Sequence, residues 1–321
     1  MMETAEKLIC ENYIPERDIY FAFGHDEEVG GAHGARVISK YFYDNGIEFD
    51  GVYDEGGLVV SGAISGVSSP IALIGVGEKG FCNISIKVEE SGGHASMPPK
   101  HTALGKFSEI IYDIEKNSMK SRITTPVNEI LKNICGEMGF VVKMAVANQW
   151  LFKPVLLKVL SAAPATNAMV RTTIAPTMVK GSDGANVLPQ RVEGVVNCRV
   201  LQGDTCEALM KHLNSIGDKH KALIKPLLLE EPSPTNTHSY NKLIETIGSI
   251  YPNAISTPFL LMAGTDSSKY YNVCDNIYRF TPIWITDDER GSIHSTNEAI
   301  SIENYGRMMY FYETFIRNYD K

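Results

Sequence analysis

The segment Ile19–Gly57 decides the fold, and it reads IYFAFGHDEEVGGAHGARVISKYFYDNGIEFDGVYDEGG. Its opening run, IYFAF, is apolar and aromatic, which is typical of a buried strand, and the glycines that follow open a helix predicted over 35–45. The run FDGVYD (49–54) predicts a second strand. Strands separated by a single helix usually pair in parallel through a right-handed crossover. The segment therefore predicts an α/β sheet.

A second texture follows farther along the chain. FCNISIKVEE alternates apolar and polar residues, as a strand with one solvated face should. A helix, two more strands, a helix capped by Asp204 and a last strand at 224–231 complete the pattern, and this order of elements is ferredoxin-like. We therefore predict an α/β domain made of residues 1–78 and 232–321, interrupted by an inserted α+β domain at 79–231.

Composition excludes several classes of protein. Among the 321 residues, Lys plus Arg number 30 and Asp plus Glu 38, so the formal net charge is -8. An acidic chain without a basic block is not expected to bind nucleic acid. Its most apolar stretch, FVVKMAVANQWLFKPVLLKVL, is interrupted by lysines, so no membrane span is expected. The six cysteines lack CxxC spacing and the first residues do not resemble a signal peptide, which predicts a cytoplasmic protein.

The motif GHDEEVGG places two adjacent carboxylates, Glu27 and Glu28, directly after the first predicted strand. Ligands of open α/β sheets bind beyond the carboxyl ends of the strands. Two crowded carboxylates are unfavourable unless a cation or a proton separates them, so one could hold a cation while the other acts as a base. A solvated acidic turn at a helix N-terminus explains the same residues equally well.

Two further motifs could join this site. Asp54 ends the next predicted strand, and parallel strands bring their carboxyl ends together, so Asp54 is expected near Glu28. The alternative is a turn-forming Asp before two glycines. His294 lies between a strand and the last helix, where a packed, hydrogen-bonded histidine is the ordinary interpretation. Imidazole with carboxylates is, however, a ligand set that zinc accepts.

Seven motifs occur in order along nearly the whole chain: GHDEEVGG, DEGG, GGHASMPP, GANVLPQ, NCRVLQGD, AGTDSSKYY and GSIHSTNE. Together they resemble the aminoacylase/carboxypeptidase S family of zinc-dependent amidohydrolases and exopeptidases, in particular its carboxypeptidase S-like branch. The resemblance implies a mostly parallel-sheet catalytic domain, two zinc ions in a full-length site, and a ferredoxin-like insertion that acts as a lid and dimerises.

The resemblance also implies a role for individual residues. Glu27 corresponds to the general base and His94 to the lid histidine that polarises the scissile carbonyl, although a plain loop histidine is the alternative. The residues that correspond to zinc ligands are Glu28, Asp54 and His294. Those that correspond to substrate contacts are Asn186, Arg199, Gly264 and Thr265. A surface salt bridge is the ordinary alternative for Arg199.

The expected function is zinc-dependent cleavage of an amide bond in peptides or N-acyl amino acids, by a homodimer. One feature departs from the family. Its members carry a His-x-Asp zinc motif upstream of GHDEE, and no such triplet occurs in this sequence. The sequence therefore predicts an N-terminally incomplete catalytic domain with a single weak zinc site at best. The alternative is a truncated, non-catalytic member that binds small molecules or dimerises.

Overall fold

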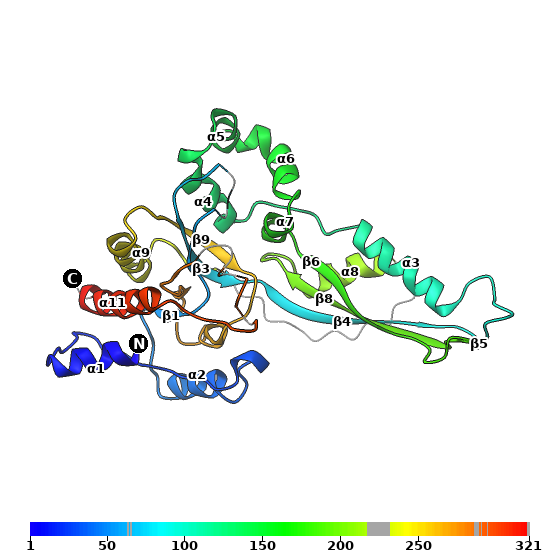
Figure 1. Cartoon of the computed structure of the whole chain (residues 1–321), viewed down its shortest axis with the longest axis horizontal. Helices are drawn as coiled ribbons and strands as arrows, with labels where there is room; N and C mark the ends of the chain where they lie inside the picture. Colours follow the sequence, from blue (N-terminus) through cyan, green and yellow to red (C-terminus); the bar gives the residue numbers. More distant parts are fainter. Residues whose placement is uncertain are drawn as a thin grey trace. The chain divides into compact units, whose positions relative to one another are not determined.

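The computed structural model describes residues 1–62, 64, 66–216, 232–285, 289, 291–293 and 295–319 (Figure 1). Contacts divide the chain into two compact units. The first consists of Met1–Glu78, Thr125–Leu156 and Pro232–Lys321, and the second of Lys79–Thr124 and Leu157–Glu231. The domain bounds predicted from the sequence stay a prediction.

The first unit is built on a mixed six-stranded sheet in the order β1-β10-β3-β2-β11, with β9 also paired to β3. The pairs β1–β10, β2–β11 and β3–β9 are parallel, whereas β3 runs antiparallel to β10 and β2. The strands are β1 Val52–Asp54, β2 Val59–Val60, β3 Ile71–Glu78, β9 Ile255–Leu261, β10 Ile277–Arg279 and β11 Trp284–Ile285. The predicted α/β class is confirmed.

Helices cover this sheet and bury its apolar side chains. The α-helices of the unit are α1 Met2–Cys10, α2 Ala35–Asp44, α4 Thr125–Ile134, α5 Phe140–Ala147, α6 Gln149–Leu160 (which runs on into the second unit), α9 His238–Ile250 and α11 Ile302–Tyr319. One core cluster joins α9 and α11 to β3 and β10 through residues such as Leu243, Ile74 and Phe311. In the described part of the chain, no helix is both long and apolar enough to cross a bilayer.

The prediction of a strand over Ile19–Phe23 is wrong. The structure has no regular secondary structure there, and Ile19, Tyr20 and Phe23 are 43%, 47% and 56% exposed. An apolar run becomes a strand only when another strand satisfies its backbone hydrogen bonds. None of the described strands pairs with the IYFAF run. Tyr20 instead rests the edge of its ring on Phe42, with ring centroids 5.4 Å apart.

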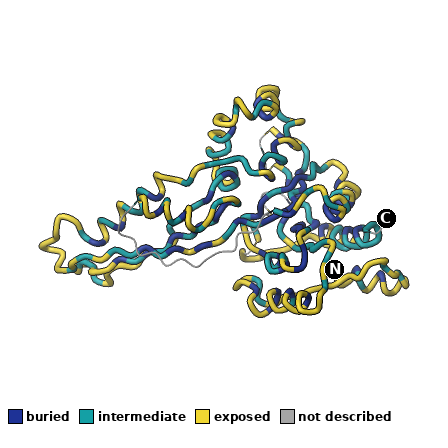
Figure 2. Tube along the Cα trace, turned by 180° about the vertical axis from the view of Figure 1, so that it is seen from behind, coloured by how far each residue is buried: buried dark blue, intermediate teal, exposed yellow. Residues whose placement is uncertain are grey.

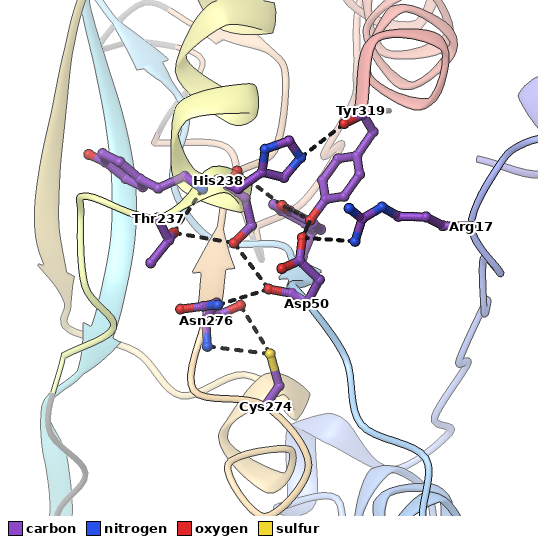
Figure 3. Close-up of polar contacts among 10 residues, drawn as sticks. Arg17, Asp50, Thr237, His238, Cys274, Asn276 and Tyr319 are labelled. Atoms are coloured by element: carbon purple, nitrogen blue, oxygen red, sulfur yellow. Dashed lines mark hydrogen bonds and ion pairs between the residues drawn. The ribbon is translucent and has the colours of Figure 1, made fainter. Parts of the chain in front are cut away.

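A polar cluster lies at the amino ends of the paired strands β1 and β10 (Figure 3). The Asp50 carboxylate accepts a hydrogen bond from the Tyr319 hydroxyl at 2.7 Å, and its backbone carbonyl accepts from Asn276 Nδ2 at 2.9 Å and Ser239 Oγ at 3.1 Å. Cys274 lies beside Asn276, where burial raises the pKa of its thiol to about 11. These contacts fasten α11 and α9 to the start of the sheet.

The second unit is a three-stranded antiparallel sheet, β4-β8-β6, with α3 and α8 packed against it. Cys82 on β4 lies opposite Cys198 on β8, and both thiols are free and buried. The elements are β4 Gly80–Glu89, β5 Gly93–His94, α3 Ala103–Lys116, α7 Pro164–Val170, β6 Thr173–Lys180, β7 Val187–Leu188, β8 Arg191–Val200 and α8 Cys206–Ile216. The last strand predicted for the ferredoxin-like pattern, at 224–231, lies outside the described residues.

The predicted cap of α8 is corrected by one residue. The Thr205 hydroxyl accepts the hydrogen bond from the Ala208 amide at 3.1 Å, which is the capping contact. Asp204 makes an ion pair with Arg122 at 2.6 Å instead, so its carboxylate is already engaged.

Candidate functional site

The carboxyl end of β1 positions Asp54, the first of the predicted site residues. Its side chain is half-buried, and its Oδ2 accepts a hydrogen bond from the backbone amide of Ser267 at 2.7 Å. Ser267 belongs to a short 3-10 helix, η3 Asp266–Lys269. The contact therefore ties the AGTDSS turn, which follows β9, to the end of β1, although the two motifs are far apart in the sequence.

The GHDEEVGG motif folds as a tight loop that contains a 3-10 turn, η1 Glu27–Val29. Asp26 closes this loop, because its carboxylate accepts hydrogen bonds from the amides of His33 and Gly34, each at 2.8 Å. Gly31 has φ +63°, and a Cβ on it would lie 2.6 Å from Asp266 Oδ1. Glycine is thus required where the loop approaches the η3 carboxylate.

Glu27 lies among like charges. Its pKa is raised first by partial burial and then by the nearby carboxylates of Glu28, Glu55, Asp266 and Asp54. The pKa of Asp266 is raised as well, mainly by burial and by Asp54. Glu28 and Asp54 therefore both act electrostatically on Glu27, and the predicted proximity of Asp54 to Glu28 stays a prediction.

The chemistry of this donor set fits a divalent cation. The atom Asp266 Oδ1 is buried without a hydrogen-bond partner, and crowded carboxylates need a cation or protons to offset their repulsion. Carboxylate oxygens are ligands for zinc and for harder divalent ions. Within the described ranges, however, no three His, Cys, Asp or Glu side chains converge as a complete ligand group. The predicted ligand His294 lies outside the described residues.

A buried ion pair between Arg279 and Glu78 supports the residues around Asp54. Arg279 is 0% exposed, and its Nε donates to Glu78 Oε1 at 2.8 Å. The Thr265 hydroxyl donates to the same oxygen at 2.8 Å, and Arg279 lies directly opposite Asp54 in the parallel β1–β10 ladder. The pair therefore fixes the turn that carries Gly264 and Thr265. Sequence reasoning missed it, although a single arginine inside the apolar run NIYRF was an available signal.

The predicted substrate residues of the second unit divide into two groups. His94 and Asn186 are neighbours, because β5 pairs with β7 and the amide of Ala95 donates to the carbonyl of Asn186 at 2.9 Å. His94 Nδ1 also lies 2.8 Å from the Ser96 hydroxyl. Arg199 lies near the carboxyl end of β8, roughly 27 Å along the strand from Arg191 at the end nearer to β7.

Arg199 does not form, with any described residue, the surface salt bridge that was the alternative to a substrate contact. Its guanidinium stacks over the Phe81 ring at 4.8 Å, and no carboxylate pairs with it among the described residues. In the first unit, the hydroxyl of Thr265 is buried and already bonded to Glu78, while a Cβ on Gly264 would lie 3.6 Å from Glu78 Oε2. The roles of these residues in binding substrate stay predictions.

Comparison with known proteins gives the class. Residues 76–223 match the peptidase dimerisation domain family. The fold is similar to that of the M20 family metallo-carboxypeptidase Sso-CP2 from Sulfolobus solfataricus, with a TM-score of 0.66 at 16% identity over 99% of this chain and 74% of that one. Human carnosine dipeptidase 1 gives a TM-score of 0.62 at 12% identity, over 98% of this chain and 69% of that one. The fold is that of M20 exopeptidases.

Sequence relatives support the family resemblance. The chain is 35% identical to Probable carboxypeptidase S-like 2 of Dictyostelium discoideum and 32% identical to N-fatty-acyl-amino acid synthase/hydrolase PM20D1 of Mus musculus. Both matches cover 100% of this chain, which spans 63% and 65% of the length of those relatives. The chain is therefore similar over its whole length to carboxypeptidase S-like and N-fatty-acyl-amino acid synthase/hydrolase proteins, as the resemblance noted in the sequence implied.

Proposed function

We propose that this chain carries the general base and part of the metal site of a hydrolase that cleaves an amide bond in peptides or N-acyl amino acids. The observation that carries the proposal is the raised pKa of Glu27 among four other carboxylates beside the end of β1. The names of the relatives, carboxypeptidase S-like and N-fatty-acyl-amino acid synthase/hydrolase, support the choice of bond.

The proposed metal ligands are Glu28, Asp54 and His294, with zinc as the proposed ion. A bound zinc ion would lower the pKa of a coordinated water and polarise the substrate carbonyl. Glu27 takes the proton from the attacking water and passes it to the leaving nitrogen. Its raised pKa favours the first step, because a stronger base accepts the proton more readily.

The second unit is proposed to contribute substrate contacts and a homodimer interface. The match of residues 76–223 to a peptidase dimerisation domain supports the dimer. His94 and Asn186 are exposed neighbours on the β5–β7 pair, so they can meet a substrate together. The Ser96 contacts occupy His94 Nδ1, which leaves Nε2 to donate a hydrogen bond to a developing oxyanion.

The test combines metal analysis with turnover. The dialysed protein is assayed for zinc per chain, and then for hydrolysis of a panel of dipeptides and N-acyl amino acids. Glu27→Gln is expected to keep its zinc and lose turnover by about 10²- to 10⁴-fold, the range typical of a general base. Asp54→Asn is expected to lose zinc. Glu6→Gln, which alters an exposed acid on α1, is the matched control and should change neither.

A second candidate function is a non-catalytic member that binds small molecules or dimerises. The match of residues 76–223 to a peptidase dimerisation domain favours its dimerising part. The same experiment separates the two candidates. Zinc binding with chelator-sensitive turnover supports the hydrolase, whereas full turnover by Glu27→Gln contradicts the role of Glu27. Neither zinc nor turnover, together with dimers in light scattering, supports the second candidate.

A further inference from the structure

The helices α5 and α6 carry large apolar side chains that stay exposed among the residues the structure describes. Between Phe140 and Val155 these helices bury few apolar side chains, and Figure 2 shows mostly exposed residues along them. We call the exposed apolar residues of this stretch the 140–155 patch. Its main members, with their exposed fractions, are Phe140 78%, Val141 71%, Trp150 82%, Leu151 55% and Val155 56%.

This amount of exposed apolar surface needs a partner. A helix that is apolar on nearly all sides is normally buried in a core or in lipid. Contiguous exposed apolar side chains on a soluble domain mark an interaction surface. The patch sits within residues 125–156 of the first unit, apart from the carboxylate cluster in sequence, and no residue proposed for hydrolysis belongs to it.

The charges around the patch identify the kind of partner. No Asp or Glu occurs between Glu137 and Asp183, whereas the chain as a whole has a net charge of -8. Lys143 on α5 and Lys153 on α6 are both exposed and lie among the patch residues. A local excess of lysine on an acidic protein complements an anionic surface, and the acidic remainder would be repelled by it. The charge pattern therefore orients the patch toward negative charge.

We propose that the 140–155 patch docks on an anionic lipid surface. Helices that lie in a membrane interface place aromatic and aliphatic side chains among the acyl chains and lysines at the headgroups. Tryptophan prefers this boundary, and Trp150 is the most exposed member of the patch. With 8 residues in α5 and 12 in α6, these helices are too short to span a bilayer, so they lie on its surface. The inference stands independently of the proposed hydrolase.

The test uses vesicles of phosphatidylcholine alone and of phosphatidylcholine with phosphatidylserine. The full chain is expected to cosediment with the anionic vesicles only. Its tryptophan emission should shift to the blue, because Trp150 moves from water into the interface. Trp150→Phe should still bind but lose the shift. Replacing Lys143 and Lys153 with Gln should weaken binding by about fivefold per lysine, since each lysine near the surface contributes on the order of 1 kcal/mol.

Matched variants distinguish binding through the patch from nonspecific effects of net charge and of exposed apolar residues. Replacing the exposed Lys100 and Lys120 with Gln makes the same change in net charge outside the patch, and should leave binding unchanged. Ile302→Ser removes a 92% exposed apolar side chain elsewhere in the first unit, and should also bind normally. Trp150→Ser with Leu151→Ser should abolish binding while circular dichroism stays unchanged.

Three outcomes would overturn the proposal. One is the absence of binding to anionic vesicles. Another is equal binding to neutral and anionic vesicles, because the lysines would then contribute nothing. The third is self-association in light scattering that Trp150→Ser with Leu151→Ser dissolves, because the patch would then be an interface between two copies of the chain.

Discussion

The buried Glu78–Arg279 pair allows a prediction whose size follows from the structure. Arg279 is 0% exposed and the Glu78 side chain 11%, so neither group regains water when its partner is removed. Arg279→Met leaves a buried carboxylate that still accepts a hydrogen bond from the Thr265 hydroxyl. Removing one member of a buried ion pair costs about 3–5 kcal/mol of the free energy of unfolding. Glu78→Gln keeps an acceptor for Arg279, and should cost about 2–3 kcal/mol.

The double variant decides whether the charges act as a pair. Replacing both residues removes the uncompensated charge, so Glu78→Gln with Arg279→Met should cost no more than Arg279→Met alone. This corresponds to a coupling of at least about 2–3 kcal/mol, the loss expected for Glu78→Gln. Urea unfolding followed by tryptophan fluorescence measures it, because Trp150 and Trp284 both belong to the first unit.

Two results would refute this reasoning. One is additivity, with the double variant losing the sum of the two single losses, because the residues would then act independently. The other is a loss below about 1 kcal/mol for Arg279→Met, which a buried unpaired charge does not permit. Lys40→Met is the control. It breaks the exposed pair with Asp44, in which the side chains are 71% and 50% exposed, and should change stability by less than about 0.5 kcal/mol.

Three further predictions concern the loop and the exposed segment. Because the pKa of Glu27 is raised in the folded state, the metal-free protein should lose stability as pH rises through the interval between the ordinary Glu pKa and the raised one, and Glu27→Gln should flatten melting temperature against pH there; parallel curves would contradict this. Gly31→Ala should lower the free energy of unfolding in urea by about 2 kcal/mol or more, because its Cβ would lie 2.6 Å from Asp266 Oδ1 and its φ is +63°. Gly248→Ala is the control, because nothing lies within 4 Å of its Cβ, and it should be neutral or stabilising. Phe23→Ser, which alters a 56% exposed ring, should slow aggregation in light scattering and leave the urea midpoint unchanged; a lower midpoint would show that the ring is packed.

Local patterns made most of the elements predictable. The helix expected over 35–45 is α2 at Ala35–Asp44, and the strand expected in FDGVYD is β1 at Val52–Asp54. Such elements depend on periodicity and caps within a few residues, which a single sequence displays. The IYFAF run shows the limit of this reasoning. Its composition favours a strand, but composition contains no information on whether a neighbouring strand is present to pair with it.

The candidate residues could be named from the sequence, but the contacts that support them could not. Asp54 ends β1 as the predicted strand implied, whereas the strand predicted before Glu27 and Glu28 does not form, and the roles of all three residues stay predictions. The Glu78–Arg279 pair joins residues that lie 201 positions apart, and no local pattern relates them. The last helix shows a similar limit. Aromatic residues recur along it, but their composition does not tell which of them are buried: Tyr305 is 43% exposed, whereas Phe311 and Phe315 are buried.

The buried thiols make the chain its own reporter of local opening. Cys82 and Cys198 face each other across β4 and β8, and burial raises the pKa of Cys198 to about 12, so these thiols stay protonated and shielded while the second unit is closed. Cys274 does the same for the first unit. Alkylation rates at these positions would measure how often each unit opens, with exposed Cys10 as the freely reacting reference. Both tryptophans belong to the first unit, so their emission does not report opening of the second unit, whereas alkylation of the buried thiols reports opening of both.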